Sequence, residues 1–210
     1  ARAGTILLDA TPLGTMRPRA RARAVALIES EPEVAAELRV LEIVRTGRFA
    51  RRAWWDWTAD PEDDAAARTA LAAVELAGFG ERRIGELSSG ERRRVWLALA
   101  LAQEAHLVLL DEPTAHLDPR HALETICTIR GLVRRGAATI AVFHDLNEAA
   151  LVADRIALVA EGGFLACDRP ERALDPALLE RAYGVAFERI IVEGRPRVFV
   201  GRAPRATAVS

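Results

Sequence analysis

The sequence contains no lysine, only two cysteines and few aromatic residues. All 29 basic residues are arginine; they nearly balance 30 acidic residues, so the formal net charge is −1. This balance argues against general binding to nucleic acid, which needs an excess of basic groups against the phosphates. Cys127 and Cys167 lack metal-type spacing, and we expect them to be buried or half-buried thiols in a reducing cytosol.

Long hydrophobic runs are also absent. No apolar run approaches the ~18 residues that a transmembrane helix needs. The apolar segment after Arg17–Arg23 is too short for a signal peptide. Half of the 210 residues are hydrophobic, so the chain can bury a sizeable core. We therefore expect a soluble chain whose role at a membrane would come through a partner.

Short apolar strands alternate with helical segments. The pattern predicts strands at Thr5–Leu8, Ala24–Ile28, His106–Leu110 and Ala138–Phe143, and helices over Gly90–Gln103 and Pro119–Arg135. Such strand–helix–strand units predict a parallel α/β sheet that is covered on both faces. Towards the C-terminus we expect strands at Ile156–Ala160 and Phe164–Cys167, a helix at Pro176–Tyr183 and a hairpin of Phe187–Val192 with Arg197–Val200.

The segment from Val34 to about Gly78 differs from the rest in its helical spacing of Ala, Leu and Arg. We interpret it as a small helical subdomain. It contains Trp54, Trp55 and Trp57, for which two interpretations stay open. They pack beneath a loop, or they form a docking surface for a membrane partner, since aromatic residues beside arginine are typical of interfaces.

The segment Leu87–Glu91 directly precedes a predicted helix. Ser88 and Glu91 fit a capping box, which predicts an ordinary capped helix. The same residues fit an anion site, because hydroxyls and a glycine lie at the positive end of the helix dipole, which favours phosphate.

Two adjacent acids, Asp111 and Glu112, end the predicted strand around Leu107–Leu110. A parallel strand delivers such residues to the carboxyl edge of the sheet, where ligands of α/β proteins bind. Successive side chains point in opposite directions, so Asp111 suits Mg²⁺ and Glu112 suits an attacking water. The alternative is that both acids merely cap a strand.

His144 ends the next predicted strand, which we expect to neighbour the strand of Asp111. A histidine there could bridge a γ-phosphate and the attacking water, although a histidine at a strand end is more often structural. No chemistry is assigned to His106, His116 or His121.

Together, Leu87–Glu91, Leu107–Glu112, Ala115–Asp118 and His144 resemble the signature motif, Walker B motif, D-loop and switch histidine of ABC-transporter ATPases. The resemblance covers essentially the whole chain. It implies a P-loop NTPase-like parallel sheet, with an ATPase core at residues 1–30 and 95–210 and an inserted helical subdomain at residues 31–94.

The resemblance also implies roles for single residues. Ser88, Ser89, Gly90 and Glu91 would contact ATP bound by the opposite subunit, and Asp118 would lie at the dimer interface. Asp111 would serve Mg²⁺, Glu112 would be the catalytic base, and His144 would sense the γ-phosphate.

The implied function is an ATP-hydrolysing subunit of an ABC importer at the cytoplasmic face of the cell membrane, paired with a second ATPase subunit as a homodimer and with permease subunits. The sequences at His144–Asn147 and Asp175–Val185 are most similar to the branch importing iron–siderophore complexes, haem or cobalamin. The alternatives are a non-transport ABC ATPase acting on ribosomes or DNA, and a non-catalytic partner subunit.

The sequence departs from the family in three places. A phosphate-binding loop needs a lysine, which this sequence lacks. We therefore expect an upstream strand–loop–helix unit of roughly 30 residues or more to be cut off and the isolated chain to be inactive. Ser30 stands at the position where the family carries the Q-loop glutamine, and Ser89 replaces the first glycine of the signature motif.

Overall fold

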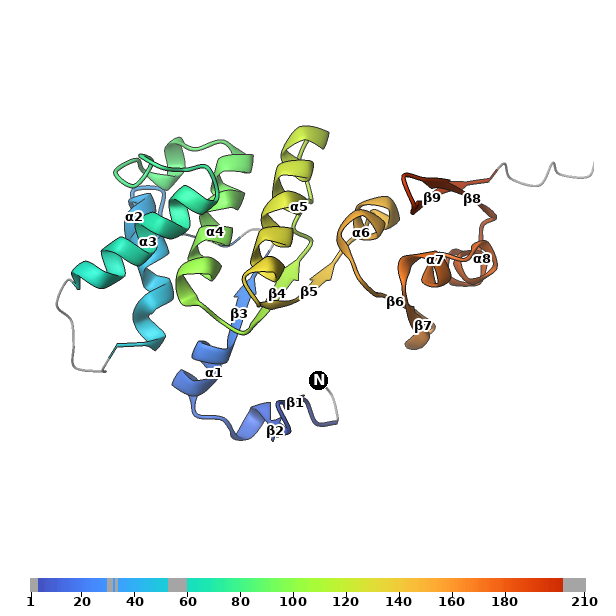
Figure 1. Cartoon of the computed structure of the whole chain (residues 1–210), viewed down its shortest axis with the longest axis horizontal. Helices are drawn as coiled ribbons and strands as arrows, with labels where there is room; N and C mark the ends of the chain where they lie inside the picture. The colour runs from blue at the N-terminus through green and yellow to red at the C-terminus, as the bar shows by residue number, and fades with distance from the viewer. Residues whose placement is uncertain (1–3, 30–31, 33, 53–59, 202–210) are drawn as a thin grey trace, which may run out of the picture. The chain divides into compact units, whose positions relative to one another are not determined.

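The computed structural model describes residues 4–29, 32, 34–52 and 60–201. Ser30, Trp54, Trp55 and Trp57 lie outside the described residues, so the interpretations of these positions stay predictions. The chain divides into two compact units, residues 1–142 and 143–210, and each is considered separately (Figure 1).

The first unit is built on a three-stranded parallel sheet. Its strands are β3 (Val25–Ile28), β4 (Leu107–Asp111) and β5 (Ala138–Val142), in the order β3-β4-β5. The register pairs Val25 with Leu107, and Leu107 with Ala138. The sequence therefore predicted these strands to within about one residue, because short apolar runs between helices are typical of parallel strands.

The two faces of this sheet differ in exposure. Ala26, Ile28, Val108 and Leu110 point to one face and are at most 3% exposed. Leu27 and Ile140 point to the other face and are 61% and 60% exposed. The prediction that both faces are covered is therefore wrong for the described residues, because their helices α4 (Ser89–Gln103) and α5 (Pro119–Arg134) pack on one face.

Asp-Pro pairs start three of the helices. Asp118 accepts hydrogen bonds from the first-turn amides of α5, and Asp60 and Asp175 do the same for α3 (Pro61–Ala73) and α8 (Pro176–Tyr183). An aspartate supplies the acceptor that the free amides need, and proline at the first helical position needs no donor. These starts can be recognised directly in the sequence.

Helices α2 (Val40–Thr46) and α3, with the 3₁₀ turns η2 (Gly47–Ala50) and η3 (Ile84–Glu86), form the helical part of the first unit (Figure 1). Both helices pack against α4. Helix α4 is continuous across residue 94, where the sequence placed the end of the helical subdomain. The division into core and helical subdomain stays a prediction.

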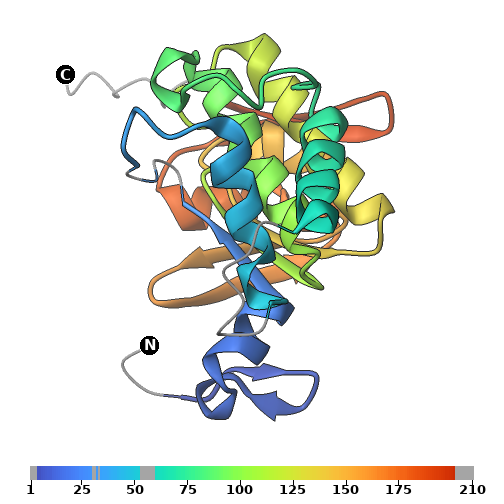
Figure 2. The same cartoon turned by 90° about the vertical axis from the view of Figure 1, so that its left-hand side faces the viewer.

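The N-terminal segment of the first unit is a short hairpin followed by a helix. Strands β1 (Leu7–Leu8) and β2 (Thr11–Pro12) pair antiparallel, and η1 (Leu13–Thr15) and α1 (Pro18–Ala24) follow. Figure 2 shows this blue segment at one end of the unit. The predicted strand Thr5–Leu8 ends at Leu8 as expected but begins only at Leu7. Asp9 and Ala10 then turn the chain into β2 with φ values of 46° and 63°.

The second unit has its own core. Its elements are α6 (Leu146–Val152), β6 (Ile156–Ala160), β7 (Gly163–Asp168), α7 (Pro170–Ala173), α8, β8 (Phe187–Val192) and β9 (Arg195–Val200). The strands form two antiparallel hairpins, β6-β7 and β8-β9. Leu174 and Leu179 are fully buried in the core with Ala150. Both hairpins and the helix at Pro176 agree with the sequence prediction.

Two further properties bear on the sequence predictions. Cys127 and Cys167 are free and exposed, so the prediction that they are at least half-buried is wrong. They lie on α5 and β7, where their positions in the helical and alternating periods fall on the solvent side.

Within the described part of the chain, no helix combines the length and apolar character required for a membrane span.

Candidate functional site

The signature segment forms a capping box at the start of α4. The Ser88 hydroxyl accepts a hydrogen bond from the Glu91 amide (3.2 Å), and Glu91 Oε2 accepts from the Ser88 amide (2.8 Å) and hydroxyl (2.8 Å). These bonds, first the one from the Ser88 amide, lower the pKa of Glu91. Ser88 and Ser89 are exposed, whereas Gly90 is buried. The helix start is thus rigid but leaves two serines facing solvent.

Gly90 brings this helix start next to His121, which contacts Asp118 at the end of the predicted D-loop. A Cβ atom on Gly90 would meet the ring of His121, with Cδ2 at 2.6 Å, so this close approach requires glycine. The same ring contacts Asp118 through Nδ1 and Oδ2 (2.5 Å). The amide of His121, and then its ring, lowers the pKa of Asp118, the N-cap of α5. The sequence analysis assigned no chemistry to His121, and the spacing Asp118–His121 on a helix start is the signal it missed.

Asp111 and Glu112 lie where the sequence placed them, at the carboxyl end of the central strand. Asp111 is the last residue of β4 and is exposed. Glu112 adopts the left-handed conformation (φ 45°), which is uncommon for a residue with a side chain. Its carbonyl accepts a hydrogen bond from the Ala115 amide (3.1 Å), which closes a turn. The strand therefore ends in a sharp turn that redirects the chain at Glu112.

Arg93 supports this turn from helix α4. Its guanidinium donates to the carbonyls of Pro113 (2.9 Å), Asp111 (3.1 Å) and Glu29 (2.8 Å). Burial lowers the pKa of Arg93 to about 10, and the nearby charge of Asp111 partly opposes this shift. The sequence analysis missed Arg93, because it lies between Arg92 and Arg94 in a run of identical charges.

His144 belongs to the second unit, directly before α6. Asp145 caps this helix by accepting from the amides of Asn147 (2.6 Å) and Glu148 (3.3 Å). The Asn147 side chain pairs with both backbone groups of Val198 on β9 (2.9 and 3.1 Å). The segment after His144 is therefore held firmly within its own unit. The approach of His144 to Glu112 stays a prediction.

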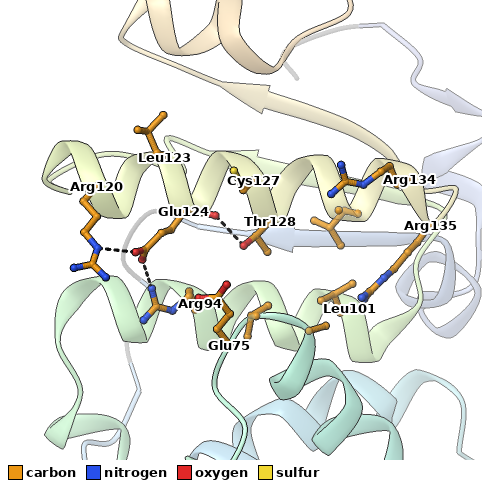
Figure 3. Close-up of a pocket in the computed structure, with 14 residues that line it drawn as sticks. Glu75, Arg94, Leu101, Arg120, Leu123, Glu124, Cys127, Thr128, Arg134 and Arg135 are labelled. Carbon is orange, nitrogen blue, oxygen red and sulfur yellow. Dashed lines mark hydrogen bonds and ion pairs between the residues drawn. The ribbon is translucent and has the colours of Figure 1, made fainter.

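A groove of about 580 Å³ borders the predicted motifs in the first unit. Ser89, Arg93 and Trp96 of α4 line it, with His116 of the D-loop opposite them. A second groove of about 580 Å³ lies between α4 and α5, where Glu124 accepts from Arg94 (2.5 Å) and Arg120 (3.0 Å) (Figure 3). None of the described residues lining this second groove is a predicted site residue.

Asp111, at the end of β4, fits the Mg²⁺ ion that the motifs imply. Mg²⁺ in nucleotide sites is bound by one or two carboxylates, and water and phosphate oxygens complete its octahedron. Asp111 is exposed at the sheet edge and can supply such a carboxylate. Within the described residues, His, Cys, Asp and Glu form no group of three that could hold a metal by themselves. This donor set suits a metal that arrives with a nucleotide.

Solved structures share this fold. The ATP-binding cassette MJ1267 in its ADP conformation superimposes with a TM-score of 0.73 at 21% identity, covering 85% of this chain and 76% of MJ1267. For cbiO1 from Clostridium perfringens, part of the ABC transporter complex cbiONQ, the TM-score is 0.72 at 22% identity, with 85% of this chain and 71% of that chain covered. The fold is that of an ABC-type P-loop NTPase domain, as the sequence predicted.

Sequence comparison gives the family. The ABC transporter family profile matches residues 1–115. The petrobactin import ATP-binding protein FpuD of Bacillus anthracis is 35% identical over 86% of this chain and 66% of FpuD. The hemin import ATP-binding protein HmuV of Jannaschia sp. (strain CCS1) is 37% identical over 88% of this chain and 69% of HmuV. This chain belongs to the ABC transporter family, and it spans about two thirds of the length of these relatives.

Proposed function

We propose that the full-length protein containing this chain is the ATP-binding and ATP-hydrolysing subunit of an ABC importer. The observation that carries this proposal is the turn at the end of β4. Asp111 ends the central strand of the parallel sheet there and Glu112 follows it, and Arg93 of the signature helix α4 donates to the carbonyls of Asp111 and Pro113 on either side of Glu112. Carboxylates at the carboxyl edge of such a sheet are suited to binding and hydrolysing a nucleotide.

The proposed cargo is an iron–siderophore complex, haem or cobalamin. Relatives named for the import of petrobactin and hemin are 35% and 37% identical to this chain, which supports that branch. The segment around Asp145 and Asn147 carries the resemblance to this branch. Asp145 caps α6 and Asn147 binds Val198 of β9 through hydrogen bonds, so both residues also have a structural role.

Each carboxylate has a separate role in the proposed hydrolysis. Asp111 would hold Mg²⁺, which when bound neutralises negative charge on the phosphates. Glu112 would orient the attacking water and accept its proton, since a carboxylate next to a nucleotide site is suited to act as a general base. His144 would donate a hydrogen bond to the terminal phosphate.

The signature segment and Asp118 would face a second ATPase subunit. Ser88, Ser89 and Asp118 are exposed, and the contact of Gly90 with His121 keeps the two motifs in a fixed relation. Amides at a helix start with exposed hydroxyls are suited to the phosphates of a nucleotide held by the opposite subunit. We propose a homodimer that binds permease subunits at the cytoplasmic face of the membrane.

The test is hydrolysis of MgATP by the full-length protein and its Glu112→Gln variant. Glutamine keeps the shape of the side chain but cannot accept the proton. We expect kcat to fall by about a hundredfold or more, and the variant to accumulate as an ATP-bound dimer in size-exclusion chromatography. Wild-type kcat in this variant would show that Glu112 is not the base.

Glu75→Gln provides the matched control. Glu75 is an exposed glutamate of the first unit with the same left-handed backbone (φ 62°), and it lies after α3, away from the proposed site. We expect its kcat to stay within about twofold of the wild type, since surface substitutions away from a site have small effects. A large loss in both variants would point to a general effect of removing carboxylates.

A further inference from the structure

Arg93 is the most buried arginine for which the structure gives several backbone partners. It lies one turn after the start of α4 and is 5% exposed. Its three guanidinium nitrogens donate to three main-chain carbonyls, those of Pro113, Asp111 and Glu29. An arginine fork presents donors in several fixed directions, which allows one side chain to hold separate segments together.

Two of these carbonyls flank Glu112. The carbonyl of Asp111 belongs to the peptide before Glu112, and that of Pro113 lies just beyond it. Between them, Glu112 has a φ of 45°, a conformation that persists when the surrounding structure enforces it. Fixing both neighbouring carbonyls fixes the orientation of the Glu112 backbone, and with it the direction in which its carboxylate points.

The third carbonyl, that of Glu29, lies just after β3. Arg93 therefore connects the ends of two neighbouring strands, β3 and β4, to the helix that begins with the signature segment. The guanidinium group of arginine carries a positive charge in proteins, so Arg93 binds these carbonyl oxygens through charge-assisted hydrogen bonds.

We propose that Arg93 is a positioning residue for ATP hydrolysis, which holds the turn of Glu112 in its active conformation and links it to the signature helix α4. This inference rests on the proposed function. Ser88–Glu91 form the start of the same rigid helix, so a shift of α4 at the subunit interface would be transmitted to Glu112 within one helical turn. Arg93 thus connects the surface facing one nucleotide with the base acting on another.

The test compares Arg93→Gln with Arg48→Gln in the full-length protein. Arg48 is also a largely buried arginine, but it contacts Asp63 and the end of α4. Both variants should lower Tm. For Arg93→Gln we expect kcat for MgATP to fall by about tenfold to a hundredfold, the effect of a misplaced catalytic group, with KM within about twofold. For Arg48→Gln we expect kcat to stay near the wild-type value.

Arg93→Lys keeps the test valid if Arg93→Gln does not fold. Lysine keeps the charge and part of the hydrogen bonding, so we expect a kcat between those of the wild type and Arg93→Gln, lowered by about three- to tenfold. A kcat in Arg93→Lys and Arg93→Gln no lower than in Arg48→Gln would overturn the proposal.

A double variant separates positioning from general damage. If Arg93 acts through Glu112, adding Arg93→Gln to Glu112→Gln should not lower the residual single-turnover rate further. Multiplied losses would mean that Arg93 acts independently of Glu112. Failure of the proposed function itself looks different: the wild-type full-length protein would then not hydrolyse MgATP at all, and the Arg93 variants would have no wild-type rate to fall from.

Discussion

The two ends of helix α4 use arginine in opposite ways. At the N-terminal end, Arg93 donates to three backbone carbonyls, and burial lowers its pKa to about 10. At the C-terminal end, Arg48 and Arg52 both pair with the carboxylate of Asp63, which is 4% exposed. Burial lowers the pKa of Arg48, but hydrogen bonds to Asp63 and Glu104 outweigh it, so the pKa is raised.

The arginines that contact the two ends of α4 therefore have different roles. At the C-terminal end, Arg48 and Arg51 also donate to the last carbonyls of α4, where cations favour the helix dipole. This cluster pairs its arginines with the carboxylates of Asp63 and Glu104 and joins α3 to α4, so it stabilises the helical part of the unit. The cation at the N-terminal end instead holds a backbone turn next to the proposed base, so it fixes geometry.

The largest effect is expected from breaking the charge balance at the C-terminal end. Asp63→Asn leaves two largely buried arginines around a neutral amide. We expect the free energy of unfolding to fall by about 3 kcal/mol, because the substitution removes the carboxylate that these two largely buried cations share. Urea denaturation of the full-length protein measures this, with Asp64→Asn, at a half-exposed neighbour, as control. Equal losses in both variants would contradict the cluster's special role.

Replacing each arginine by lysine sharpens the comparison. Lysine carries a compact charge, which still pairs with one carboxylate but cannot reach three separate carbonyls. We expect Arg93→Lys to lower the free energy of unfolding by about 2 kcal/mol through unmatched carbonyls, and Arg48→Lys by about 1 kcal/mol. Losses in the reverse order would show that both arginines act mainly through charge.

The close approach at the N-terminal end gives the next prediction. In Gly90→Ala the new methyl group would displace the ring of His121, whose Cδ2 lies 2.6 Å from the Cβ position. We expect a loss of about 1 kcal/mol through overpacking, and recovery of most of it in Gly90→Ala/His121→Ala. Chemical denaturation of the four proteins of this cycle gives the coupling energy.

Gly131→Ala is the control for the methyl group itself. Gly131 lies in α5, where a Cβ would meet no atom within 4 Å. This variant should be more stable than the wild type by up to about 1 kcal/mol, since alanine has the higher helix propensity. A Gly90→Ala variant with the same gain would show that His121 moves freely.

The last prediction concerns the capping box of α4. Ser88→Ala should cost about 1 kcal/mol at pH 7, and Ser88→Thr much less. Ser88 lowers the pKa of Glu91 in the folded state, so this stabilisation is present above the ordinary pKa of 4.5 and is lost as the pH falls through the lower, folded value. Urea denaturation at pH 7 and below pH 4.5 should therefore show a smaller Ser88→Ala effect in acid. A constant difference would mean that the Glu91 carboxylate contributes little.

Much of the fold could be predicted from the sequence, because helix starts and strand ends depend on residues that are adjacent in the chain. The Asp-Pro pairs at Asp118 and Asp175 mark helix starts, and the apolar run ending in Asp111 marks a buried strand and its edge. The structure confirms these elements to within a residue or two. The prediction for Cys127 was wrong because it followed from residue type alone: the buried residues of α5, such as Ile126 and Ile129, follow the helical period, and Cys127 lies off that face.

The motifs that carry the proposed chemistry were likewise found from the sequence, since Ser88–Glu91 and Asp111–Glu112 are contiguous and their order is informative. The residues that support them were not found. His121 contacts Gly90 across 31 positions of the chain, and nothing in the local sequence of either residue indicates that contact.

The sequence by itself determined the order of strands and helices, the caps, and the carboxylates at the end of β4. Only the tertiary structure decided which arginine of the run Arg92–Arg94 turns inward. All three have the same side chain and adjacent positions. Helical geometry gives each a different direction, and the packing of α4 against the sheet places Arg93 alone against the carbonyls of Asp111 and Pro113. Burial, rather than residue type, made it different from its neighbours.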